Sequence, residues 1–117
     1  MTAPTTTDPS QLPAVVRGYL AAHTAKDADT AIRSYTTDAV VVDDGRTYRG
    51  TGEIIAWLRD AATEYRYTVE LTGAQRIDDE HWIAFLHLEG DFPGGVADLR
   101  YGLVLRDDRI SQLTITA

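Results

Sequence analysis

The spacing of apolar residues changes near residue 65, and this change limits the folds open to the chain. Before it, apolar residues repeat every three or four positions, which is the period of an amphipathic helix. After it, apolar and polar residues alternate, which is the period of a half-buried strand. Ser10, Asp27 and Thr51 are the predicted N-caps of three helices. The apolar helical positions are Leu12, Val15, Val16, Tyr19, Leu20 and His23, then Ala28, Ala31, Ile32 and Tyr35, then Ile54, Ile55, Trp57 and Leu58. The predicted strands span 65–72, 81–90, 97–105 and 110–115.

Between the second and third predicted helices lies a short hairpin. Three valines at 40–42 are typical of a buried strand, and Asp44-Gly45 suits a two-residue turn whose central residues need positive φ. In that register Asp43 faces Arg46 and shares a side with Val41 and Tyr48. The hairpin therefore carries an acid on its apolar side.

Length and composition favour one domain. With 117 residues, of which 44% are hydrophobic, the chain can form one core but not two. Residues 1–9 are rich in threonine and proline and lack periodicity, so we expect a disordered tail followed by a single domain at 10–117.

Charge and residue usage exclude several classes of protein. A formal charge of −7 argues against a nucleic-acid partner, because phosphate binding needs a basic face. Without cysteine there is no disulfide or thiolate metal site, and the three histidines lack metal-ligand spacing. No signal-peptide pattern and no membrane-length apolar run is present, so we expect no membrane partner and a soluble cytoplasmic protein.

The strand at 81–90 is apolar on both sides. Trp82, Leu86 and Leu88 alternate with Phe85 and His87, and both sets need cover. One side can pack against the helices, so the other suggests a homodimer interface or a cavity. The pattern leaves open which side, and therefore whether His87, faces inward.

Together these elements predict an α+β domain. We expect a cone-shaped, curved antiparallel sheet wrapped around three N-terminal helices, which is an α+β barrel of cystatin-like arrangement. A strongly bent sheet with helices at its mouth encloses a pocket suited to a small hydrophobic ligand.

Several short strings resemble the nuclear transport factor 2-like superfamily, in particular its SnoaL-like and steroid Δ-isomerase-like members. The likeness is colinear over residues 10–115. The strings are Val15–Ala22 with Asp27 after it, Tyr35–Asp43, Arg49–Ile54 and Val69–Thr72. The superfamily includes isomerases, polyketide cyclases, dehydratases, epoxide hydrolases and members that only bind or scaffold, so fold does not choose the activity.

The resemblance to the isomerases implies roles for particular residues. It places an oxyanion-binding tyrosine at Tyr19 and a general-base aspartate at Asp43. A third position, a second oxyanion donor, matches either Tyr101 by distance from the last strand or Asp98 by its local string.

The chemistry implied is proton transfer beside a carbonyl group without a cofactor. A carboxylate in an apolar pocket is disfavoured in its charged form, so it can shuttle a proton at neutral pH. A phenol can then donate to the developing enolate oxygen. The competing interpretation is that Asp43 only flanks the turn and pairs with Arg46, which would hold it ionised. The remaining candidate ligand contacts are His23, Tyr35, Tyr48, Trp57, Phe85 and His87.

Two other functions stay open. Asp98 and Arg100 point the same way on one strand and could activate water as in epoxide-opening relatives, which would make the chain an epoxide hydrolase or dehydratase. Alternatively the domain is a non-catalytic module for ligand binding or protein interaction.

Overall fold

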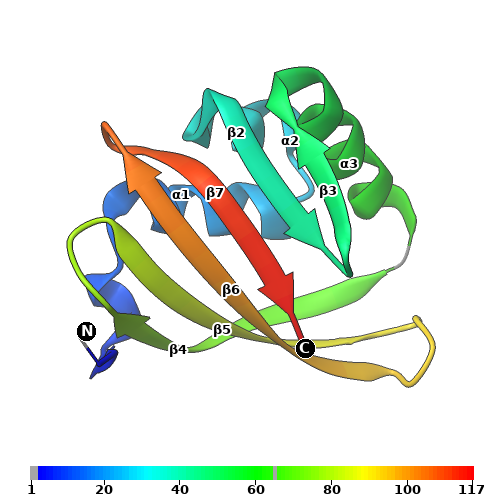
Figure 1. Ribbon diagram of the computed structural model, residues 1–117. Helices are drawn as coiled ribbons and strands as arrows, with labels where there is room; N and C mark the ends of the chain where they lie inside the picture. Colours follow the sequence, from blue (N-terminus) through cyan, green and yellow to red (C-terminus); the bar gives the residue numbers. More distant parts are fainter. Residues whose placement is uncertain (1–2, 65) are drawn as a thin grey trace.

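The computed structural model describes residues 3–64 and 66–117, and Figure 1 shows the helices gathered on one side of a curved, unclosed sheet. The elements, in chain order, are β1 (Thr5–Thr7), the 3-10 helix η1 (Pro9–Gln11), α1 (Ala14–Thr24), α2 (Ala28–Ala31), the 3-10 helix η2 (Ile32–Ser34), β2 (Tyr35–Asp43), β3 (Arg46–Arg49), α3 (Gly50–Glu64), β4 (Tyr67–Arg76), β5 (His81–Gly90), β6 (Val96–Arg106) and β7 (Arg109–Thr116). The predicted α+β cone is confirmed.

The sheet has seven strands in the order β1-β4-β5-β6-β7-β2-β3. Each neighbouring pair is antiparallel except β2 and β7, which run parallel, with Val41 opposite Leu113 and Asp43 opposite Ile115. The sheet is therefore mixed, where the sequence predicts an antiparallel one. The sequence shows strands that follow one another through short turns, and such strands pair antiparallel. β2 and β7 are far apart in the chain, so no short turn determines their relative direction.

The hairpin between β2 and β3 forms as predicted. Asp44 and Gly45 have φ of 53° and 77°, so both central turn residues lie in the left-handed region. Asp43 then stands opposite Arg46, and Val41 is fully buried. The turn fixes the direction in which the Asp43 side chain leaves the strand.

The predicted helix starts are only partly right. Asp27 caps α2, since its carboxylate accepts from the Thr30 N–H at 3.2 Å. Ser10 does not cap α1, because it lies in η1, and α1 begins after Pro13. A proline with φ of −52° and extended ψ turns the chain there, so the helix cannot extend back to Ser10.

The third helix begins earlier than predicted. Thr51 lies inside α3, which starts at Gly50 with φ of 78°. The Glu53 carboxylate accepts from the Arg49 N–H at 3.0 Å, so an acid in the first turn satisfies a donor at this end of the helix.

Two further differences concern the ends of predicted segments. Thr5–Thr7, in the stretch expected to be a loose tail, pair with Ala74–Arg76 of β4. Tyr65, the predicted start of the first long strand, lies outside the described residues, and β4 begins at Tyr67.

The core lies between the helices and the concave face of the sheet. Its largest fully buried side chains come from α1, α3, β2, β6 and β7, together with Leu12 just before α1: Tyr19, Leu12, Ile54, Leu58, Leu103, Ile110, Leu113, Val16 and Val41. In the described part of the chain, none of the helices has the length and apolar character needed to cross a membrane.

Candidate functional site

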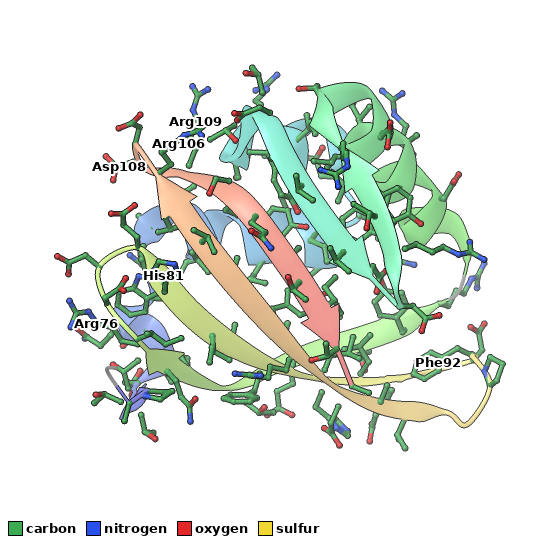
Figure 2. The ribbon with its side chains drawn as sticks, in the orientation of Figure 1. Arg76, His81, Phe92, Arg106, Asp108 and Arg109 are labelled. Atoms are coloured by element: carbon green, nitrogen blue, oxygen red, sulfur yellow. The ribbon has the colours of Figure 1, made fainter. Side chains whose placement is uncertain are left out.

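A cavity of about 420 Å³ opens at the end of the sheet where the hairpin joins β5 to β6. Phe92 lies in that hairpin, at the opposite end of the molecule from Arg106, Asp108 and Arg109 (Figure 2). The apolar part of the lining includes Leu88, Leu99 and Ile115 from three adjacent strands. The volume lies within the range of small-molecule sites.

The Asp43 carboxylate lies on the cavity wall, at the end of β2. The indole N–H of Trp57 in α3 donates to its Oδ2 at 3.0 Å, so helix and hairpin are joined across the cavity wall. Arg46, on the facing strand, is exposed, and the ion pairs between described residues do not include one that joins it to Asp43. The carboxylate therefore points toward the cavity and α3.

His23 lies in the last turn of α1, in a stack of aromatic rings. Its imidazole is stacked on Tyr19 at 5.7 Å between centroids and on Trp57 at 5.9 Å, with interplanar angles of 7° and 20°. The Tyr101 ring approaches at 6.4 Å. Burial among these rings disfavours the charged imidazole and lowers the pKa of His23 to about 4. His23 is thus a neutral group in the cavity lining at physiological pH.

Two phenols share the cavity with Asp43. Burial raises the pKa of Tyr101 well above its usual value, and the nearby Tyr19, Tyr67 and Asp43 add to the effect. Burial, and then the charge of Asp43, raises the pKa of Tyr67 as well. Both residues line the cavity and remain protonated at neutral pH, so each can donate a hydrogen bond.

Tyr19 lies behind this lining rather than in it. Its side chain is 0% exposed, and the Tyr35 hydroxyl donates to its oxygen at 2.6 Å. Burial, followed by the neighbouring Tyr35, raises the pKa of Tyr19 well above its usual value. Its own proton stays available for a second hydrogen bond, so Tyr19 can support the cavity phenols from the core side.

Three predicted site residues lie on the outer face of the sheet. Phe85 and Asp98 line a separate depression of about 450 Å³ there. His87 stands opposite Asp98, which its Nδ1 contacts at 2.6 Å, while its Nε2 contacts Glu89 at 3.2 Å. The hydrogen bond to Asp98, and then the one to Glu89, raises the pKa of His87. Asp98 is therefore not beside Asp43, whereas Tyr101 lines the same cavity as Asp43.

The cavity brings together Asp43, Tyr101, His23 and Trp57 of the residues predicted from the sequence. Tyr35 and Tyr48 are not in the lining: Tyr35 is hydrogen-bonded to Tyr19 in the core, and Tyr48 packs on Trp57 at 5.8 Å between ring centroids. Sequence reasoning missed Tyr67 and Phe92. Tyr67 falls in an alternating strand that gives no sign of its partners, and Phe92 precedes a Pro-Gly turn, where an aromatic residue on an otherwise polar loop was the available signal.

The histidine spacing predicts no metal site. Among residues 3–64 and 66–117, no three His, Cys, Asp or Glu side chains are grouped so as to hold a metal ion. The chemistry open to the lining is hydrogen bonding and proton transfer by a carboxylate, two phenols and an imidazole.

No family model matches this sequence, and neither does any curated protein sequence. Solved structures match the fold closely. A protein from Sinorhizobium meliloti named as a candidate polyketide cyclase has a TM-score of 0.85 and 29% identity, over 92% of this chain and 97% of that one. A protein from Catenulispora acidiphila with a ketosteroid isomerase-like fold was solved in complex with trimethylamine. It has a TM-score of 0.79 and 20% identity, over 95% of this chain and 87% of that one.

A third match is an NTF2-like protein of unknown function from Cytophaga hutchinsonii, with a TM-score of 0.71 and 8% identity, over 87% of this chain and 85% of that one. Cyclase-like, isomerase-like and uncharacterised proteins thus share one architecture, and the architecture does not select an activity. The chain therefore has the fold shared by these polyketide cyclase-like, ketosteroid isomerase-like and NTF2-like structures, which is the fold of the superfamily that its sequence resembles.

Proposed function

We propose that the chain binds a small hydrophobic carbonyl compound in this cavity and moves a proton on it without a cofactor, as an isomerase or cyclase. The observation that supports this most is the position of Asp43, whose carboxylate lies on the cavity wall among phenols that stay protonated. A base and hydrogen-bond donors in one apolar enclosure are what enolisation requires. Ketosteroid isomerase is the established example of this chemistry, and only its application to this chain is new.

In this proposal each group has one role. Asp43 removes a proton from the carbon beside the carbonyl and returns it to another carbon. Tyr101 donates to the oxygen on which negative charge develops, since it lines the cavity, whereas Tyr19 does not. Tyr19 and Tyr35 hold the buried hydroxyl layer behind it. The apolar side chains exclude water, which strengthens both interactions.

Exchange of α-protons in D2O tests this function before any product is known. A panel of steroid and polyketide ketones is incubated with the protein, and deuterium uptake is followed by mass spectrometry. Removing the base in Asp43→Asn should lower exchange by about 10²- to 10⁴-fold, and Tyr101→Phe by about 10²- to 10³-fold. Phe85→Leu on the outer face is the control that should leave exchange unchanged. If Asp43→Asn exchanges at the wild-type rate, Asp43 is not the base.

We also propose that the chain forms a homodimer through the outer face of its sheet. This face carries the depression lined by Phe85 and Arg100, and Val96 at its edge is 57% exposed. A two-fold interface would cover an apolar depression on both copies at once. Sedimentation velocity should give a dimer for the wild type and a monomer for Phe85→Asp, and a monomeric wild type would refute the proposal.

A further inference from the structure

The cavity lining carries negative charge without a matching positive charge among its described residues. Its described residues include the carboxylates of Asp43 and Asp44 but no lysine or arginine. His23, the remaining basic group in this lining, is neutral at physiological pH because burial lowers its pKa to about 4. The chain as a whole carries a formal charge of −7. Electrostatic complementarity therefore favours a ligand that brings a positive charge into the cavity.

The aromatic part of the lining suits the same kind of ligand. Tyr67, Phe92 and Tyr101 all contribute to it, and the rings of Tyr67 and Phe92 meet edge to face at 6.5 Å between centroids. Aromatic rings attract a cation within about 6 Å of their centre, and weakly hydrated alkylammonium ions benefit most. The Lys26 ammonium, on a residue outside this lining, already lies 5.1 Å from the centre of the Tyr67 ring, so this ring attracts a cation of the chain itself.

We propose that the cavity binds an organic ammonium ion, with its charged group close to Asp43 and Asp44 and its apolar body against the strands. Leu88, Leu99 and Ile115 form the apolar surface for that body. The proposal concerns the same cavity as the proton transfer above and goes beyond it, since ammonium binding does not require that Asp43 act as a base.

A positive charge on the ligand would also remove a difficulty of the cavity chemistry. Once Asp43 has taken the proton it is uncharged, and the enolate then forms with the Asp44 carboxylate in the same cavity lining, whose negative charge opposes it. An ammonium group on the same molecule offsets it. The two proposals together describe a carbonyl compound that carries an ammonium group.

Two isosteric probes isolate the effect of charge. Choline and 3,3-dimethylbutan-1-ol differ only in the replacement of the quaternary nitrogen by carbon. Each is titrated into the ¹⁵N-labelled full chain, and the Trp57 indole resonance, next to Asp43 and in the cavity lining, reports occupancy. We expect choline to bind at least about tenfold more tightly, equivalent to about 1.4 kcal/mol, and the difference to shrink in high salt.

Asp44→Asn removes one of the two charges with little risk to the fold. Asp44 is exposed at the turn with φ of 53°, a conformation that asparagine also adopts readily. The matched control is Glu80→Gln, which makes the same change in net charge in the turn between β4 and β5, away from the cavity. We expect Asp44→Asn to weaken choline binding by up to about fivefold, and neither variant to change binding of the neutral alcohol.

Equal affinity for the two probes would overturn the proposal, and so would an equal loss of choline binding in Asp44→Asn and Glu80→Gln. The test is independent of turnover. Deuterium exchange that depends on Asp43, without a preference for choline, would leave the proposed function intact and refute this inference alone. A preference for choline without such exchange would support this inference and refute the proposed function.

Discussion

Replacing His23 by phenylalanine should remove a large part of the loss of stability in mild acid. The imidazole is neutral in the folded protein, with a pKa of about 4 caused by burial, against an ordinary value of 6.5. Between these values the unfolded chain binds the extra proton, so the free energy of unfolding falls as the pH falls. At 1.36 kcal/mol per pH unit, the wild type should lose about 2 kcal/mol from this residue between pH 7 and pH 5. Phenylalanine can keep the ring contacts with Tyr19 and Trp57.

The assay is urea unfolding of wild type and His23→Phe at half-unit steps from pH 7.5 to 4.5. The difference between the two proteins isolates His23, because other groups titrate in both. His87 is one of these groups, and its effect has the opposite sign. Its pKa is raised in the folded protein, so protonated His87 stabilises the fold at low pH, and this stabilisation is lost as the pH rises. Parallel curves for the two proteins between pH 7 and 5 would refute the assignment of His23 as a buried neutral group.

Three further substitutions test local features of the fold, each by urea unfolding at pH 7. Gly90→Ala should destabilise the fold by about 1–3 kcal/mol, because the added Cβ would lie 2.6 Å from the Cβ of Tyr67. No loss of stability would show that β4 and β5 approach less closely at this point. Tyr35→Phe deletes the hydroxyl that donates to buried Tyr19 and should cost about 1–2 kcal/mol, with no loss if that hydrogen bond does not form. Asp27→Ala removes the cap of α2 and should lower the free energy of unfolding, whereas Asp27→Asn, which can still cap, should be close to wild type.

Local features of the fold were predictable because local chemistry determines them. The turn at Asp44 needed two residues with positive φ, and the sequence offers Asp-Gly there. The alternation along β5 likewise predicted a strand with two apolar sides. The parallel pairing of β2 with β7 was not predictable in this way, because it depends on how helices and strands far apart in the chain pack together.

The site was predictable to a smaller extent, for a related reason. Strand alternation assigns Asp98 and Tyr101 to opposite faces, but it does not say which face meets the helices. The packing of α1 and α3 decides this, and it puts Tyr101 inside and Asp98 outside. The position of Tyr19 behind the cavity lining could not be predicted either. Its hydrogen bond with Tyr35 joins residues from two elements that only the tertiary fold brings together.

The parallel contact between β2 and β7 also has a consequence for the order of folding. Asp43 stands opposite Ile115, so one wall of the cavity is completed by a strand synthesised long after the hairpin that carries Asp43. Contacts of this sequence separation form late, because the intervening chain must first lose its freedom. We expect the hairpin and helices to exist on the ribosome without a cavity, and any ligand to stabilise only the chain in which β7 has docked.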